Sequence, residues 1–381
     1  MRRASGTVAA GLVLAAGTLA CASTASTAST VGAGSRPAVA ALSGYQLNAV
    51  AVTSATNAWA VGCTIDWCDA TNSKTLIEHW NGKAWKLQAS PSPGGFTALW
   101  GVAATSARNA WAVGSSTKGT LILHWNGTDW KQVPSPNPVP LYDNLTAVTA
   151  VSARSAWAVG AVHDQTLIVH WNGTTWKRVA SPAGSLTGVA ATSAASAWAV
   201  GDGLILRWNG TSWKKEHGPL NLKGTAMFHG VAAASATSAW AAGRNSDGKV
   251  LLAGWNGTAW THVPSPPPYP AGELYGAAAT SASNFWAVGE INGAQTYTLR
   301  WNGSTWARVP SPSPGQTAVH VSWLLGVAAT SGTNAWAVGF ECVRPAGGLG
   351  DCPSEGEQNA ALILHWDGTA WTRVPSPGGQ G

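Results

Sequence analysis

The chain of 381 residues is poor in charge, because Lys, Arg, Asp and Glu together make up only 10% of it. A long solvated helix, a coiled coil or an acidic disordered chain would each carry more charge than this. After residue 22, no apolar run reaches the roughly 18 residues that a membrane-spanning helix needs. Tyr and Phe are also scarce, with 5 and 4 residues, whereas there are 24 Trp. These absences leave an apolar, Trp-rich globular chain as the expectation.

The first 22 residues have the pattern of a secretory signal. Arg2 and Arg3 form a short basic region, and a small apolar stretch follows from Thr7 to Ala20. Residues 23–44 are rich in Ser, Thr and Ala and are expected to be a flexible linker. The sequence therefore predicts export, to the medium or to the outer face of the cell membrane.

Two processing sites compete at the end of this signal. Ala20-Cys21-Ala22 resembles an ordinary cleavage site. Thr18-Leu19-Ala20-Cys21 resembles the lipobox of bacterial lipoproteins, although Thr18 stands where Leu is usual. In the second case Cys21 is lipidated, and this lipid is the only membrane anchor that we expect.

Three tryptophans recur in each of seven repeats. The first belongs to Trp-Ala-Val-Gly or a close variant and stands at Trp59, Trp111, Trp157, Trp198, Trp240, Trp286 and Trp336. The second opens Trp-Asn-Gly or Trp-Asp-Gly, at Trp80, Trp125, Trp171, Trp208, Trp255, Trp301 and Trp366. The third follows five residues later, at Trp85, Trp130, Trp176, Trp213, Trp260, Trp306 and Trp371. The repeats thus account for 3 × 7 = 21 of the 24 Trp, and such periodicity is the signature of a repeat architecture.

One repeat predicts four short strands, at residues 101–106, 110–114, 120–125 and 129–133. Asn126-Gly127 predicts a two-residue type I′ hairpin, which needs positive φ at both positions. In that hairpin Trp125 pairs with Thr128 and lies diagonal to Trp130, on the same face of the sheet.

The residue sizes within a repeat predict a radial sheet. The first strand is built of small residues and the fourth carries the bulky Trp, which suits blades that converge at an axis and spread at a rim. We therefore expect an all-β fold, a seven-bladed β-propeller of four-stranded antiparallel blades, over residues 45–377, with a tail at 378–381. The first and last repeats share no strand, so the ring must close by side-chain packing.

The order of these motifs resembles the kelch-type propeller, including the central domain of galactose oxidase. The shared features are Trp111-Ala-Val-Gly114, the apolar strand ending at Trp125, a short turn, Trp130 and a Pro-containing exit at Pro134. One Gly stands where kelch repeats have a pair. The chain looks even more like the Trp-rich exported repeat proteins of high-GC bacteria, a resemblance that implies no activity.

Four cysteines lie in the repeats as two local pairs, and export permits disulfides between them. We expect Cys63–Cys68 and Cys342–Cys352, both in loops between second and third strands. Three connectivities exist for four cysteines. The alternative is a cross-link between the first and last blades, such as Cys63–Cys342.

The histidines and basic residues that recur in the repeats are expected to have structural roles. His79, His124, His170 and His365 each precede the second Trp, and we expect hydrogen bonds between blades rather than a metal array. The net charge of +6 is spread along the fourth strands, where Lys discourages pairing with other chains. We therefore expect no metal, no cofactor and no nucleic-acid partner.

The variable loops all emerge on one face, and the candidate ligand residues lie there. In each repeat the first strand opens with Leu-x-Gly or a variant, and x is expected to ring the mouth of the channel: Asn48, Trp100, Thr146, Thr187, His229, Tyr275 and Leu325. Trp67, Trp100 and Trp323, the tryptophans outside the repeat pattern, map to the same face. Exposed aromatic rings suit sugars or a protein partner.

The sequence favours an exported, monomeric binding module for carbohydrate or a protein partner at the cell envelope. No residue is assigned a catalytic role. One alternative is a polysaccharide hydrolase or lyase that uses two of the loop carboxylates Asp143, Asp164, Asp202, Glu273, Glu290 and Glu341. The other alternative is a structural envelope scaffold.

Overall fold

The computed structural model describes residues 44–64, 68, 72–136, 143–163, 165–216, 226–267, 271–314, 320–343 and 359–377. The predicted signal with Cys21, nearly all of the linker, and the tail lie outside these residues, as do Trp67, Asp164 and Cys352. Within the described ranges, no helix is long and apolar enough to cross a membrane.

The described residues form 28 strands, grouped in seven sheets of four consecutive strands. The inner strands are β1 (Tyr45–Ser54), β5 (Thr97–Ser106), β9 (Asp143–Ser152), β13 (Leu186–Ser193), β17 (Met227–Ser235), β21 (Gly272–Ser281) and β25 (His320–Ser331). The second strands are β2 (Asn57–Thr64), β6 (Asn109–Ser116), β10 (Ser155–Val162), β14 (Ser196–Gly201), β18 (Ser238–Arg244), β22 (Asn284–Ile291) and β26 (Asn334–Val343). The third strands are β3 (Lys74–Trp80), β7 (Gly119–Trp125), β11 (Gln165–Trp171), β15 (Leu204–Trp208), β19 (Val250–Trp255), β23 (Gln295–Trp301) and β27 (Ala360–Trp366). The outer strands are β4 (Trp85–Leu87), β8 (Trp130–Gln132), β12 (Trp176–Arg178), β16 (Trp213–Lys215), β20 (Trp260–Val263), β24 (Trp306–Arg308) and β28 (Trp371–Arg373).

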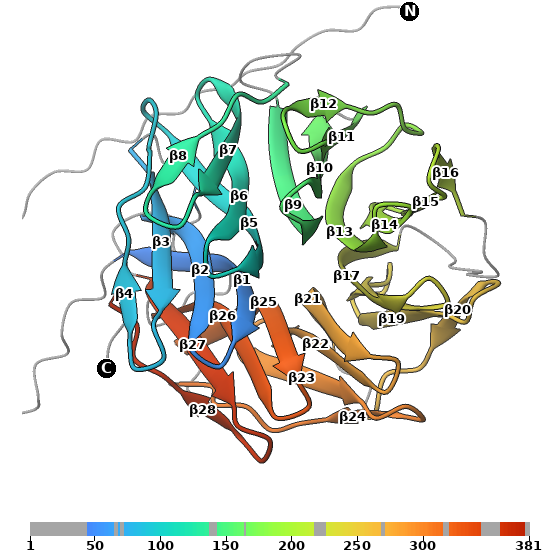
Figure 1. The fold of residues 1–381 in the computed structure, drawn as a ribbon. Helices are drawn as coiled ribbons and strands as arrows, with labels where there is room; N and C mark the ends of the chain where they lie inside the picture. Colours follow the sequence, from blue (N-terminus) through green and yellow to red (C-terminus); the bar gives the residue numbers. More distant parts are fainter. Residues whose placement is uncertain are drawn as a thin grey trace, which may run out of the picture. The chain divides into compact units, whose positions relative to one another are not determined.

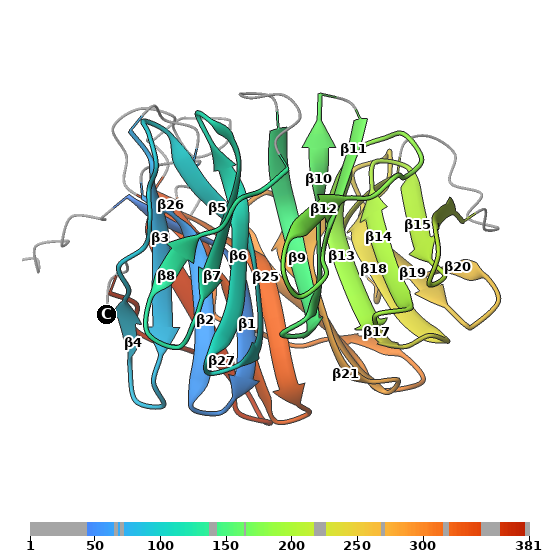
Figure 2. The same cartoon turned by 45° about the horizontal axis from the view of Figure 1, so that its top comes forward.

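The sheets are the blades of a seven-bladed β-propeller, which confirms the predicted fold. The first strand of every blade faces the centre of the ring, and the short fourth strand lies at the periphery (Figure 1). Figure 2 shows the long strands standing side by side along the direction of the channel. Blade 1 is β1–β4 and blade 7 is β25–β28, so no strand is shared across the interface between them, which we call the seam.

The hairpin between the third and fourth strands differs from the prediction. Trp125 pairs directly with Trp130 rather than with Thr128, so the loop has four residues, 126–129. The Asn126 side chain causes this, because its Oδ1 accepts hydrogen bonds from the Thr128 and Asp129 backbone amides, at 2.9 Å each. Such a side-chain turn requires the left-handed conformation only of Gly127, whose φ is +103°. The expected type I′ geometry was therefore wrong.

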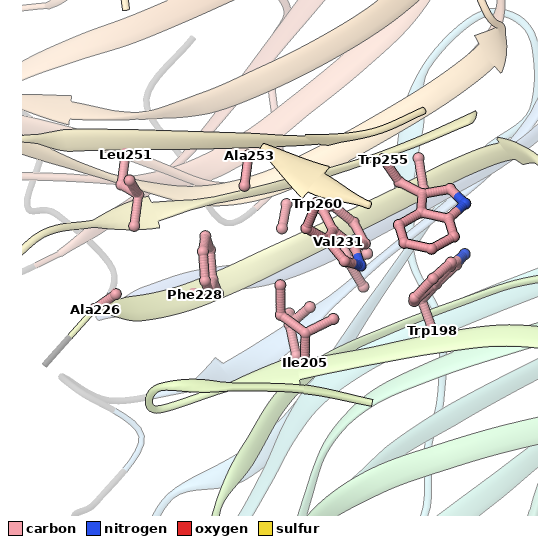
Figure 3. Close-up of a cluster of buried hydrophobic side chains, with 12 residues drawn as sticks. Trp198, Ile205, Ala226, Phe228, Val231, Leu251, Ala253, Trp255 and Trp260 are labelled. Atoms are coloured by element: carbon pink, nitrogen blue, oxygen red, sulfur yellow. The ribbon is translucent and has the colours of Figure 1, made fainter. Parts of the chain in front are cut away.

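Packing between blades depends on a triplet of tryptophans. Trp59 of blade 1 lies 4.8 Å from Trp125 and 5.1 Å from Trp130 of blade 2, measured between ring centroids, and it meets Trp130 at 88°. Trp198 of blade 4 meets Trp255 and Trp260 of blade 5 in the same way (Figure 3). The first Trp of each repeat thus packs between the second and third Trp of the next blade.

The seam uses the same triplet. Trp336 of blade 7 lies 4.9 Å from Trp80 and 5.1 Å from Trp85 of blade 1. A buried hydrogen bond is added there, because Ser376 Oγ donates to Glu78 Oε1 at 2.7 Å. Glu78 is fully buried. Side-chain packing therefore closes the ring, as the sequence predicted, and a backbone hydrogen bond from the Tyr45 amide to the Asn359 carbonyl, at 3.0 Å, also crosses the seam.

The cysteines follow the local pairing in blade 1. Cys63 and Cys68 form a disulfide, so the alternative Cys63–Cys342 cross-link is excluded. The bridge is buried against Ala98, Phe96 and Trp100 of blade 2. Cys342 is also disulfide-bonded, and its predicted partner Cys352 lies outside the described residues.

The periodic histidines act within a blade, so the expected hydrogen bonds between blades were wrong. His79 stacks on Trp59 with a centroid distance of 4.1 Å, and its Nε2 bonds Asn57 Oδ1 of the same blade at 2.8 Å. The arginine that replaces histidine in blade 6 does reach across, since Arg300 donates to the Gly332 carbonyl of blade 7 at 3.0 Å. Only the longer side chain spans the interface.

If the seam is closed by the repeated contact, Trp336→Ala and Trp157→Ala should destabilise the protein equally. Each substitution removes the central ring of one triplet, and the expected cost is about 3–5 kcal/mol. Urea unfolding followed by circular dichroism measures it. A much smaller loss for Trp336→Ala than for the matched blade 3 variant would mean that other contacts close the ring.

The stacked histidines make stability depend on pH. Burial lowers the pKa of four histidine side chains below the ordinary 6.5, namely His79, His124, His170 and His365. The unfolded chain therefore takes up protons that the folded chain does not, and the stability is full above pH 6.5 and lost as pH falls through that value.

We expect the variant His124→Arg to weaken this dependence. Blade 4 carries Arg207 at the same position, 5.1 Å from the Trp198 ring, so the substitution has a precedent in the fold. The free energy of unfolding is measured between about pH 7 and pH 5. His262→Gln, at an exposed position, is the control. An unchanged slope for His124→Arg would contradict the assignment.

Candidate functional site

Every inner strand carries a β-bulge at the same place. Leu47 pairs with Gly62 and Ala49 pairs with Val61, which leaves Asn48 without a partner across the sheet. A bulge re-aims the side chain of its extra residue. The extra residues of the seven blades are Asn48, Trp100, Thr146, Thr187, His229, Tyr275 and Leu325. They are the positions that the sequence placed at the channel.

The glycine of Trp-Ala-Val-Gly is a consequence of this bulge. A Cβ added to Gly114 would lie 1.9 Å from the Ala98 carbonyl oxygen of the neighbouring inner strand. No side chain fits at that distance. The repeated glycine therefore lets the inner strand bulge toward the channel.

The seven bulge residues line one cavity of about 170 Å³ at the centre of the ring. The remaining walls are the small residues that follow each of them, such as Gly101 and Val102. Since the inner strands contribute little beyond small residues, the bulge side chains set the chemistry of the channel.

Three bulge side chains are committed to holding neighbouring blades together. Asn48 Nδ2 donates to the Leu99 carbonyl of blade 2 at 2.8 Å. Thr146 Oγ1 donates to the Leu186 carbonyl of blade 4 at 2.9 Å, and Thr187 Oγ1 donates to the Phe228 carbonyl of blade 5. Their hydroxyl and amide donors thus have structural partners within the ring. The bulge residues of the other blades are the candidates for contacting a ligand.

Blades 5 and 6 bring four polar side chains together beside the channel, and two of them, His229 and Tyr275, line its cavity. Glu273 Oε1 bonds His229 Nε2 and lies 3.2 Å from Arg244 Nε, while the Tyr275 hydroxyl donates to Glu273 Oε2 at 3.3 Å. The Arg244 side chain is 42% exposed, and among the described residues its Nη2 hydrogen-bonds the Met227 thioether at 3.3 Å. A thioether is a weak acceptor, so the guanidinium has donors to spare.

Electrostatics set the charge of two members of this cluster, the Glu273 carboxyl and the Tyr275 hydroxyl. Burial raises the pKa of the Glu273 carboxyl, but the hydrogen bond from His229 and the charges of His229 and Arg244 outweigh it, so the pKa is lowered. Burial and the neighbouring carboxylates of Glu273 and Glu290 raise the pKa of Tyr275. Glu273 is therefore an anion and Tyr275 a neutral hydroxyl at ordinary pH.

Aromatic rings extend the cluster into blade 7. The His229 and Tyr275 centroids lie 5.4 Å apart, and Tyr275 stacks on Trp323 at 6.0 Å with planes 22° apart. Trp323 is half-buried, and its indole N–H donates to the Gly293 carbonyl at 3.3 Å. We call His229, Arg244, Glu273, Tyr275 and Trp323 the mouth cluster.

Of the two other non-repeat tryptophans, the one that the structure describes lies outside the mouth cluster. Trp100 lines the channel from blade 2, with its indole N–H donating to Ser115 Oγ at 3.1 Å. Trp67 is outside the described residues. The sequence placed Glu273 among the loop carboxylates, but Arg244 and its pairing with Glu273 were not predicted. The available signal was the position of Glu273, two residues before the bulge residue Tyr275.

The loop carboxylates that the structure describes do not form a free pair. Glu273 and Glu290 face each other across β21 and β22, but Glu290 is buried and accepts a hydrogen bond from the Gly293 amide at 2.6 Å. Glu341 is paired with Arg373, and Asp143 is buried. Asp202 is exposed, and Asp164 lies outside the described residues. No group of three or more metal-ligating side chains occurs among the residues that the structure describes.

No protein-family model matches the chain, and no curated protein matches its sequence. Solved structures do share its fold. They include YCF48 bound to D1 peptide, with a TM-score of 0.56, 15% identity, and coverage of 78% of this chain and 92% of that chain. U3-55K gives a TM-score of 0.56 and 13% identity, over 84% of this chain and 96% of that one.

A third similar structure is an enzyme. The GH74 xyloglucanase from Xanthomonas campestris gives a TM-score of 0.57 and 13% identity, over 85% of this chain and 58% of that chain. At such identities these likenesses show the propeller fold alone. They leave the kelch-type resemblance unconfirmed, because none of these three structures is named as a kelch-type propeller.

Proposed function

We propose that the protein is a binding module that recognises an extended segment of a protein partner at the mouth of its channel. The observation that carries the proposal is the mouth cluster, in which aromatic rings and a half-exposed arginine meet beside a cavity. An arginine with spare donors binds peptide carbonyls or a carboxylate, and aromatic rings hold apolar side chains.

Binding fits this site better than hydrolysis. A glycosidase needs one protonated carboxyl as acid and a second carboxylate at a set distance. Glu273 is held as an anion by three donors, and its neighbour Glu290 is buried with an amide partner. Neither carboxyl is suited to give up a proton to a substrate.

The structural neighbours support a protein ligand. YCF48, which shares the fold, has been solved with a D1 peptide bound. Carbohydrate is the second candidate, since the xyloglucanase has the same architecture and the partly exposed Trp323 and Trp100 suit sugar stacking. The experiment below separates the two.

The purified full-length protein is tested against a displayed library of random linear peptides and, in parallel, an array of immobilised glycans. We expect peptides to be selected, and Trp323→Ala, Trp100→Ala or Glu273→Gln to weaken their binding about tenfold or more. Asn209→Asp is the control, since it lies in a hairpin on the opposite face and copies Asp367 of blade 7.

Unchanged melting temperatures show that each variant folds. Binding to glycans alone, lost in the same variants, would favour carbohydrate over peptide. Selected peptides that bind all mouth variants as well as the parent protein would contradict the site.

We also propose that the module is exported and held at the membrane by a lipid on Cys21. The support is the basic and apolar pattern of residues 1–22. We expect Cys21→Ala to move the protein from the membrane fraction to the medium, because a single anchor is removed. Immunoblots of the two fractions measure this, and the intact mass of the parent protein reports the lipid. Equal release of both proteins would indicate ordinary secretion.

A further inference from the structure

The rim between blades 1 and 2 departs from the repeat at two positions. The chain leaving β4 reads Leu87-Gln88-Ala89, where blade 2 has Gln132-Val133-Pro134. Leu87 is 49% exposed, and the other six blades have a polar or charged residue at its position. Ala89 stands where four blades have proline, although blade 3 also has an alanine there, Ala180. Blade 1 therefore presents a different edge from its neighbours.

A pocket of about 310 Å³ lies at this edge. Residues 88–91 of blade 1 form one wall, and Trp125, Thr128, Asp129 and Trp130 of the blade 2 hairpin form the other. Because Ala89 lines the pocket, a proline ring at that position would take up part of the space.

The walls offer one apolar surface and several polar groups. Trp125 is half-buried, and its indole N–H is already bonded to the Ala107 carbonyl at 3.0 Å, so the pocket meets mainly ring carbon. The Asp129 carboxylate is 64% exposed, with Lys131 Nζ 4.0 Å away and the Thr128 hydroxyl at 3.4 Å. These contacts are long, so the carboxylate can accept further hydrogen bonds.

We propose that this pocket binds a neutral pyranose sugar. A pyranose has an apolar C–H face that packs on the Trp125 ring and hydroxyl groups that donate to the Asp129 carboxylate and bond the Gln88 amide. The volume is at the small end of ligand pockets, which suits one or two sugar rings rather than a peptide segment. The negative charge of Asp129 disfavours acidic sugars. This site is separate from the mouth cluster and does not depend on the proposed function.

Methyl glycosides of glucose, galactose, mannose and N-acetylglucosamine are the probes, titrated into the full-length protein by calorimetry and saturation-transfer NMR. We expect saturable binding of at least one, with a Kd on the order of 1 mM. Ala89→Pro, which restores the residue of blade 2, and Asp129→Asn should each weaken it about tenfold or more.

Two controls locate the site. Thr175→Asn changes the matching exposed position in the blade 3 hairpin, and Trp323→Ala changes the mouth cluster, and both should bind the sugar as the parent does. Absence of saturable binding by all four glycosides would overturn the proposal, as would parent-like binding by folded Ala89→Pro and Asp129→Asn. Loss of binding in Trp323→Ala would place the sugar at the mouth and would equally overturn it.

Discussion

The packing of one tryptophan between two tryptophans of the next blade is the contact on which the rest of the structure depends. Trp111 of blade 2 lies 4.8 Å from Trp171 and 5.1 Å from Trp176 of blade 3, the last pair at 90°. This geometry sets the edge of one ring against the face of another, the arrangement that aromatic quadrupoles favour. Because the partners always belong to different blades, a single repeat cannot bury its own tryptophans. An open ring would therefore leave its two end blades incompletely packed, and the seam closes with the contact used elsewhere.

The bulge of the inner strand is the second constraint. Its backbone geometry is the same in every blade, whereas the side chain that it directs into the channel differs from blade to blade. The glycine opposite the bulge leaves room for it, and the extra residue then points into the channel whatever its type. In blades 1, 3 and 4 that residue bonds the next blade, as Thr146 does with the Leu186 carbonyl. In blades 5 and 6 it is His229 or Tyr275, and both bond Glu273 of blade 6, so the His229 contact also joins two blades. The same backbone feature thus serves assembly in part of the ring and a candidate site in another part.

Residues that depart from the repeat pattern lie at the two candidate ligand sites, the mouth cluster and the rim pocket. The mouth cluster exists because Glu273 and Arg244 occur in one blade each, at positions that the repeat does not specify. The rim pocket is lined by Ala89, which stands where blade 2 has a proline. Residues that all blades share therefore explain the fold, whereas residues that vary between blades indicate candidate ligand sites.

Much of the fold could be read from the sequence, because the seven repeats, the four strands of each and the ring of bulge residues follow from spacing alone. The local pairing of Cys63 with Cys68 followed from proximity in the chain. Spacing could not reveal the hairpin geometry, because the Asn126 side chain competes with the backbone for its hydrogen bonds. Spacing could not reveal the histidine partners either, because the reach of a side chain depends on the distance between blades. The sequence by itself determined the number of blades and which residues face the channel, because both depend on periodicity. Only the tertiary structure decided that Glu273 meets His229 and Arg244, because the three come from different strands of two blades and the curvature of the ring sets their distances.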